Sequence, residues 1–125
     1  KLSSGGREAV THWRVTERFG FAARLEVTLE TGRTHQIRVH LGHLRHPVVG
    51  DPEYGGRKKL LSAAQAERSL AAALLRDLPR QALHAEVLEL EHPVTGKHMT
   101  FSSPWPDDMM RALERLRAGI DPATP

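Results

Sequence analysis

A cluster of polar residues with the chemistry of an anion-binding site lies where one predicted element gives way to the next. Its members are Arg33, Thr34, His35, Gln36 and Arg38. Alternating apolar residues before them are typical of a strand, whereas Ile37, Leu41 and Leu44 follow a helical spacing. A helix N-terminus presents free backbone N–H groups and the positive end of the dipole, which favour anions. With Thr34 as the predicted N-cap, the pattern predicts a phosphate or carboxylate site.

Arg38 has the most specific chemistry in this cluster, because a guanidinium stays charged and forks onto a carboxylate or phosphate. It directly follows Ile37, so we expect it at the border of the helix's buried face. Buried there without a carboxylate partner, Arg38 would be an unpaired and costly charge. The alternative is a solvated arginine that only flanks the core, and the spacing leaves both open.

A second basic group follows the Gly55-Gly56 turn and consists of Arg57, Lys58 and Lys59. Taken with Arg33 and Arg45, it favours contacts that track the phosphates of a nucleic acid without reading its sequence. The alternative is an ordinary solvated loop.

Four histidines, His35, His40, His43 and His46, raise the question of a metal site. His40 and His43 are one helical turn apart, but the predicted helix holds no carboxylate and the chain holds no cysteine. A His-x-x-His spacing without glutamate is not a hydrolase signature. We therefore predict no metal and assign these histidines to solvent, to backbone caps or to RNA phosphates.

The composition sets the class of protein. With 125 residues, 39% of them hydrophobic, the chain can bury one core and is unlikely to hold two domains. A net charge of +3 with eight histidines and a pI near 9.8 favour a polyanion partner. The absence of cysteine excludes disulfides and is compatible with a reducing compartment, and no apolar run is long enough for a membrane span. We expect a cytoplasmic protein.

The elements that would position these residues alternate between strands and helices. Gly20 separates two strands that we expect to pair as a hairpin, and Pro47 ends the first helix. Ser62 and Gln65 form a capping box, and Pro106 opens the last helix, whose core stripe is Met109, Leu113, Leu116 and Ile120. The pattern predicts an α+β domain with a mainly antiparallel sheet and packed helices. The predicted elements are a loop over 1–6, strands over 9–19 and 22–30, a helix over 34–45, a short strand over 48–49, a loop over 50–56, a helix over 62–78, strands over 82–91 and 97–103, and a helix from 106.

The literal sequence resembles the RluA/RluD-type RNA pseudouridine synthases, most closely those that modify large-subunit ribosomal RNA. The most specific segment is TGRTHQIRVHL at 31–41, followed by HPVVGDP at 46–52. The resemblance extends over nearly the whole chain. Its other segments are AVTHWRV at 9–15, RQALHA at 80–85, HPVTGK at 92–97 and PWPDDM at 104–109.

This resemblance implies an isomerase that converts uridine in RNA to pseudouridine and needs no cofactor. In such enzymes an aspartate carboxylate lies near the ribose and base, and an arginine pairs with it. Arg38 matches that arginine. Leu83 matches an aliphatic residue that forms the floor beneath the target base, although the residue pattern alone reads it as an ordinary core leucine. Arg33, Thr34, His35 and Gln36 match the turn that shapes the wall of the cleft, where His35 and Gln36 could equally act as local caps.

The sequence departs from the family in two respects. The catalytic aspartate of such enzymes lies in a His-Arg-Leu-Asp segment, which is absent here, and Tyr54, the only tyrosine, lies in a different motif from the base-stacking tyrosine. Asp51 lies in Gly-Asp-Pro, a turn composition, and we do not assign it catalysis. We therefore expect residues 1–125 to be the C-terminal part of a catalytic domain that needs an upstream half for activity.

Two other functions remain open at this stage. One is a non-catalytic RNA-binding module built on the same scaffold. The other is a helix-dipole site for a small anion, which is the weaker alternative because the chain has no glycine-rich nucleotide fingerprint.

Overall fold

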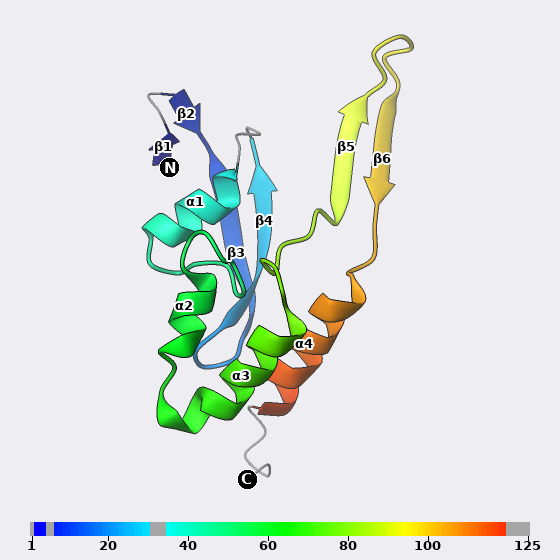
Figure 1. Cartoon of the computed structure of the whole chain (residues 1–125). Coiled ribbons are helices and arrows are strands. Elements are labelled where there is room, and N and C mark those ends of the chain that lie inside the picture. Colours follow the sequence, from blue (N-terminus) through cyan, green and yellow to red (C-terminus); the bar gives the residue numbers. More distant parts are fainter. Residues whose placement is uncertain (1, 5–6, 31–34, 120–125) are drawn as a thin grey trace.

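The computed structural model describes residues 2–4, 7–30 and 35–119. Within them, the strands form three two-stranded antiparallel sheets, and helices pack between and below these sheets (Figure 1). This arrangement confirms the predicted α+β class. The elements are β1 (Leu2–Ser4), β2 (Arg7–Ala9), β3 (Thr11–Arg18), β4 (Ala23–Leu29), α1 (Gln36–His43), α2 (Gly56–Leu61), a 3-10 turn (Gln65–Glu67), α3 (Arg68–Asp77), β5 (Val87–Glu91), β6 (His98–Ser102) and α4 (Asp107–Gly119).

The hairpin of β3 and β4 forms as predicted. Gly20 lies in its turn with a φ of 82°, a conformation that glycine adopts without strain. The register shifts between Val15 and Glu17, where a bulge interrupts the ladder. Helix α1 packs against β3, so this hairpin supports the element that carries Arg38 (Figure 1).

The core lies at the opposite end, where α3 and α4 run side by side (Figure 1). Leu74 and Leu78 are fully buried there, and Leu60 of α2 and Phe19 belong to the same cluster. The predicted stripe of α4 is confirmed at its three described positions, which are all buried: Met109, Leu113 and Leu116. The fourth, Ile120, lies outside the described residues.

The predicted capping box at Ser62 is wrong. Ser62 is the C-cap of α2, a short helix that the sequence pattern did not reveal, and its hydroxyl donates to the carbonyl of Lys59 at 2.9 Å. The 3-10 turn follows, and α3 begins only at Arg68. Serine suits either end of a helix when a backbone group lies in reach, so the Ser-x-x-Gln spacing was ambiguous.

Three further boundaries differ from the prediction. Val48 and Val49 form no strand, because the Val48 carbonyl accepts the N–H of Asp51 in a turn. Residues 82–86 are not part of β5, which begins at Val87, and Ala82 donates to the carbonyl of Val49 at 2.8 Å. Leu2–Ser4, predicted as part of a loop, pairs with Arg7–Ala9.

The hairpin of β5 and β6 extends away from the rest of the chain (Figure 1). Leu88 and Phe101 are cross-strand partners on one face, and their exposed fractions are 57% and 49%. Of the helices that the structure describes, none is long and apolar enough to cross a membrane.

Candidate functional site at Arg38

Helix α1 buries polar side chains rather than the predicted apolar stripe. Leu41 is buried as expected, but Ile37 is only half-buried and Leu44 is 43% exposed. Gln36, Arg38 and His40 are buried instead. Buried polar groups need partners, and each of these three finds one in a neighbouring element.

Gln36 and His40 fasten α1 to the start of β3. The side-chain amide of Gln36 donates to the Val10 carbonyl at 3.0 Å and to the Thr11 hydroxyl at 2.9 Å. The same hydroxyl lies 2.8 Å from Nδ1 of His40. Gln36 therefore bonds across the fold, and its alternative role as a local cap stays a prediction.

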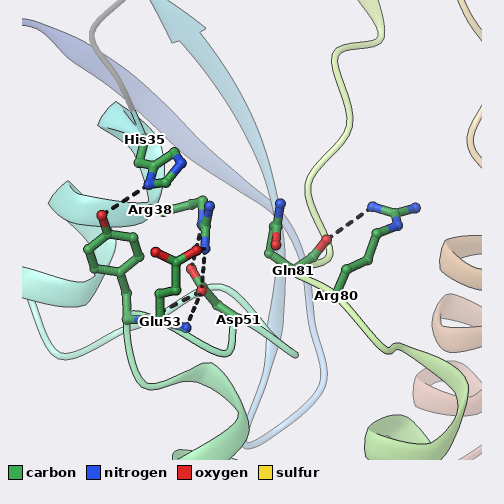
Figure 2. Close-up of polar contacts among 7 residues, drawn as sticks. His35, Arg38, Asp51, Glu53, Arg80 and Gln81 are labelled. Atoms are coloured by element: carbon green, nitrogen blue, oxygen red, sulfur yellow. Dashed lines mark hydrogen bonds and ion pairs between the residues drawn. The ribbon is translucent and has the colours of Figure 1, made fainter.

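Arg38 lies with its guanidinium against the carboxylate of Asp51 (Figure 2). Nε donates to Oδ2 at 2.9 Å and Nη2 donates to Oδ1 at 2.8 Å, a fork-to-fork geometry. Nη2 also donates to Oε1 of Glu53 at 3.0 Å. The Arg38 side chain is 7% exposed and the Asp51 side chain 0%, so this is a buried ion pair with a second, outer carboxylate.

The loop that carries Asp51 is held in a compact shape by its glycines. A Cβ on Gly56 would lie 1.9 Å from the Val48 carbonyl oxygen, a distance that no side chain tolerates. Oδ1 of Asp51 accepts the backbone N–H groups of Glu53 at 3.0 Å and Tyr54 at 3.3 Å. The Asp51 carboxylate therefore closes its own turn while it binds Arg38.

Tyr54, at the end of the same loop, covers the face of the guanidinium. The Arg38 Cζ atom lies 5.1 Å from the centre of the Tyr54 ring, within the range of a cation–π contact. The Tyr54 hydroxyl lies 3.1 Å from Nδ1 of His35, and the two rings meet edge to face. His35, the N-cap of α1, has a left-handed φ of 52°, which is uncommon for a residue other than glycine.

The ion pair shifts the pKa of both partners. Hydrogen bonds from Arg38 lower the pKa of the Asp51 carboxyl, burial opposes this, and the N–H groups of Glu53 and Tyr54 lower it further. The bond to Asp51 correspondingly raises the pKa of Arg38. Asp51 is therefore ionised at neutral pH, and its oxygens are occupied by hydrogen-bond donors.

The sequence left open whether Arg38 is solvated or is buried without a partner, and the structure shows neither. Arg38 is buried, and its partner is a carboxylate of this same chain. The assignment of Asp51 to a turn was correct but incomplete, and Glu53 and Tyr54 were missed as contacts of Arg38. The available signal was the short loop of glycines and acids that follows α1.

Comparison with known proteins gives the context of this site. The family model described as RNA pseudouridylate synthase matches residues 1–43. Three bacterial proteins named ribosomal large subunit pseudouridine synthase D align with almost the whole chain. The identity is 49% for the protein of Vibrio vulnificus, over 93% of this chain and 35% of the relative. It is 54% for that of Xanthomonas campestris, over 90% and 33%, and 47% for that of Escherichia coli K12, over 93% and 35%.

The chain is related to the RNA pseudouridine synthases. It spans about a third of the length of the relatives that it matches. The family-model match includes β3, β4 and α1, and so contains Arg38. The Asp51 loop lies within the longer alignments, which cover at least 90% of the chain.

The basic cluster after the Gly55-Gly56 turn is more engaged with the protein than the sequence indicated. The Arg57 guanidinium donates to the carbonyls of Leu78 at 2.6 Å and Leu75 at 2.9 Å, at the C-terminal end of α3. Nζ of Lys59 donates to the Arg45 carbonyl at 2.6 Å, whereas Lys58 is exposed. Arg57 therefore has a structural role that sequence reasoning missed, and RNA contacts by this cluster stay a prediction.

The remaining predicted site residues belong to other segments of the chain. Leu83 is half-buried in the segment after α3, and its role beneath a target base stays a prediction. In the same segment, Nη1 of Arg80 donates to the carbonyl of Gln81 at 3.1 Å (Figure 2). Nη2 of Arg80 donates to the carboxylate of Asp108 at 3.0 Å. Arg33 and Thr34 lie outside the described residues, and the prediction of Thr34 as N-cap is wrong because the N-cap of α1 is His35.

The histidines of α1 separate from one another. His40 is buried against Thr11, whereas His43 is exposed. Within residues 2–4, 7–30 and 35–119, no three His, Asp or Glu side chains come together as a metal site would require.

Proposed function

We propose that this chain supplies the arginine-bearing part of the active site of an RNA pseudouridine synthase that acts on large-subunit ribosomal RNA. The observation that supports this most directly is the buried and oriented guanidinium of Arg38 within the segment that matches the family model. The relatives named for the large ribosomal subunit support the substrate class.

The reaction requires little beyond positioned polar groups. The N1–C1′ bond of uridine breaks and a C5–C1′ bond forms. C5 loses its proton and N1 takes one up, so the product is an isomer of the substrate. No electrons enter or leave, and no cofactor is needed. An arginine held out of water orients a reacting carboxylate and stabilises its charge more strongly than a solvated one.

Asp51 is a poor candidate for the reacting carboxylate. Its side chain is 0% exposed and accepts hydrogen bonds from Arg38, Glu53 and Tyr54. We infer that the carboxylate that acts on uridine comes from residues outside these 125. Nη1 of Arg38 makes no hydrogen bond to any residue that the structure describes, so its two donors remain for that carboxylate or for the RNA.

The net charge of +3 and the exposed Lys58 and Arg45 support binding to RNA phosphates. Arg33, Thr34, His35 and Gln36 shape the wall of the cleft in this proposal, and Leu83 forms its floor. A protein that modifies ribosomal RNA acts where ribosomes are made, so we also propose a cytoplasmic location.

The test uses transcripts of large-subunit ribosomal RNA, with small-subunit transcripts as the control. The chain alone, and a longer polypeptide that contains it, are incubated with each RNA, which is then digested and analysed for pseudouridine by chromatography. We expect pseudouridine in large-subunit RNA with the longer form and none with the chain alone.

Each other outcome is informative. Pseudouridine formed by the chain alone would overturn the inference that the reacting carboxylate lies outside it. Salt-dependent RNA binding without product from either form would favour the non-catalytic RNA-binding module. Neither binding nor product would leave the small-anion site as the better interpretation.

A further inference from the structure

We infer that Asp51 is the positioning residue of the site: it fixes the orientation of Arg38 and so determines where the guanidinium presents its free donors. This inference rests on the proposed function, because Arg38 must take part in the reaction for its orientation to matter.

The geometry of the pair defines the orientation of the whole guanidinium. A planar group bound along one edge, here through Nε and Nη2 to the two Asp51 oxygens, cannot rotate without breaking both bonds. The directions of the two remaining Nη1 donors are then fixed. The ring of Tyr54 on the guanidinium face restricts tilting in the other direction.

Asp51 is itself held in place by the backbone of its own loop. Oδ1 accepts the N–H groups of Glu53 and Tyr54. Gly50 behind it has a φ of 80° and is packed so closely that a Cβ would lie 2.4 Å from the Arg80 carbonyl oxygen. The backbone of this loop therefore determines the orientation of Arg38 through Asp51.

Glu53 is the natural comparison, because it also binds Arg38 but cannot fix its orientation. Its carboxylate meets Nη2 through a single oxygen, and its side chain is 58% exposed. Because the Glu53 carboxylate is largely in water, we expect its ion pair with Arg38 to contribute less than the buried pair with Asp51. Removal of the Glu53 charge should leave the Arg38–Asp51 fork in place.

A purely structural role for Asp51, as the acceptor that closes its own turn, can be separated from positioning by Asp51→Asn. The amide oxygen of the substituted side chain can still accept the N–H groups of Glu53 and Tyr54. Its NH₂ group would face the Nε donor of Arg38, so the fork is lost while the turn is kept. Asp51→Glu keeps the negative charge, but its longer side chain displaces the guanidinium of Arg38.

The experiment compares the unmodified protein, Asp51→Asn, Asp51→Glu and the control Glu53→Gln, in the form of the protein that makes pseudouridine. Turnover and KM are measured with large-subunit RNA, and the Arg38 Nε–H signal is followed by NMR. We expect both Asp51 variants to lower kcat about 100-fold with KM unchanged, the cost of a misplacement near 1 Å. Glu53→Gln should keep both kcat and the protected Nε–H signal, which Asp51→Asn should lose.

The inference is overturned if Asp51→Asn loses the Nε–H signal but keeps its kcat. If an Asp51 variant is unfolded in the assay, sucrose is added to restore the folded fraction. A kcat that then returns with folding would show that Asp51 acts only on stability, whereas a low kcat in the folded variant supports positioning. Absence of product from the unmodified protein would instead overturn the proposed function, and this role with it.

Discussion

Gly50 lies so close to Arg80 that a Cβ on Gly50 would come within 2.4 Å of the Arg80 carbonyl oxygen. The loop that binds Arg38 is therefore pressed against the segment after α3. Ala82 joins the same contact by donating to the Val49 carbonyl at 2.8 Å. This backbone contact connects the site at α1 to the core formed by α3 and α4.

Substitution of Gly50 by alanine should be much more damaging than the same change at Gly20. Both have a φ near 80°, but nothing lies within 4 Å of a Cβ at Gly20. We expect Gly20→Ala to lower the free energy of unfolding by about 1–2 kcal/mol from the left-handed backbone alone. Gly50→Ala should cost about 2–5 kcal/mol, since overpacking adds to it. Urea unfolding measures both, and equal costs would contradict the close approach.

Arg57 should matter for stability and its neighbour Lys58 for RNA. Arg57→Ala removes the donors to the carbonyls of Leu75 and Leu78 and should cost about 1.5–3 kcal/mol of unfolding free energy. Lys58→Ala, at an exposed position, should change stability by less than about 0.5 kcal/mol.

In RNA binding we expect the larger effect from Lys58→Ala and not from Arg57→Ala. Lys58→Ala should reduce the slope of log affinity against log salt by about one, and Arg57→Ala should leave it unchanged. A salt titration of RNA binding by both variants makes the comparison. A smaller slope for Arg57→Ala, at full stability, would place that guanidinium on the RNA.

The stability of the chain should fall on acidification in a way that depends on Asp51. Hydrogen bonds from Arg38 lower the pKa of Asp51 in the folded state. A lowered pKa stabilises the fold above the unfolded value, about 3.9, and the contribution is lost as pH falls through the folded pKa. The gap in unfolding free energy between the unmodified chain and Asp51→Asn should therefore be constant from about pH 5 to 7 and should shrink below that range. Unfolding curves measured across pH test this, and a gap that widens in acid would contradict it.

The β5–β6 hairpin should make the isolated chain associate with itself. Leu88 and Phe101 lie side by side across the two strands and are largely exposed, and exposed apolar patches on strand edges favour association. Phe101→Thr should shift the chain toward monomer in sedimentation experiments. Thr100→Ser, at the neighbouring position on the opposite face, is the matched control. A monomeric unmodified chain at high concentration would refute this prediction.

The parts of the fold that could be predicted were those in which local pattern and tertiary packing agree. Gly20 between two alternating segments correctly predicted the β3–β4 hairpin. The helical spacing of Met109, Leu113 and Leu116 correctly predicted the buried face of α4. Prediction was less accurate at α1, because Gln36, Arg38 and His40 are buried through bonds to distant residues that no local periodicity reveals.

The same reason explains what was missed at the site. The motif identified Arg38, but its partner Asp51 depends on a loop whose shape is set by contacts of Gly50 and Gly56 with backbone atoms. Helix α2 was overlooked because its glycine start is typical of a turn. The structural role of Arg57, which was predicted to contact phosphates, was missed because charge alone does not show where a guanidinium points.

The most direct test of the central claim is the turnover of Arg38→Lys, measured as tritium released from RNA labelled at C5 of uridine. Lysine keeps the charge but cannot fork onto Asp51 or present the planar donors of a guanidinium. In the form of the protein that makes pseudouridine, tritium release should fall at least about 100-fold, while Glu53→Gln releases tritium at the unmodified rate. A folded Arg38→Lys variant that releases tritium as fast as the unmodified protein would contradict the assignment of Arg38 to the active site.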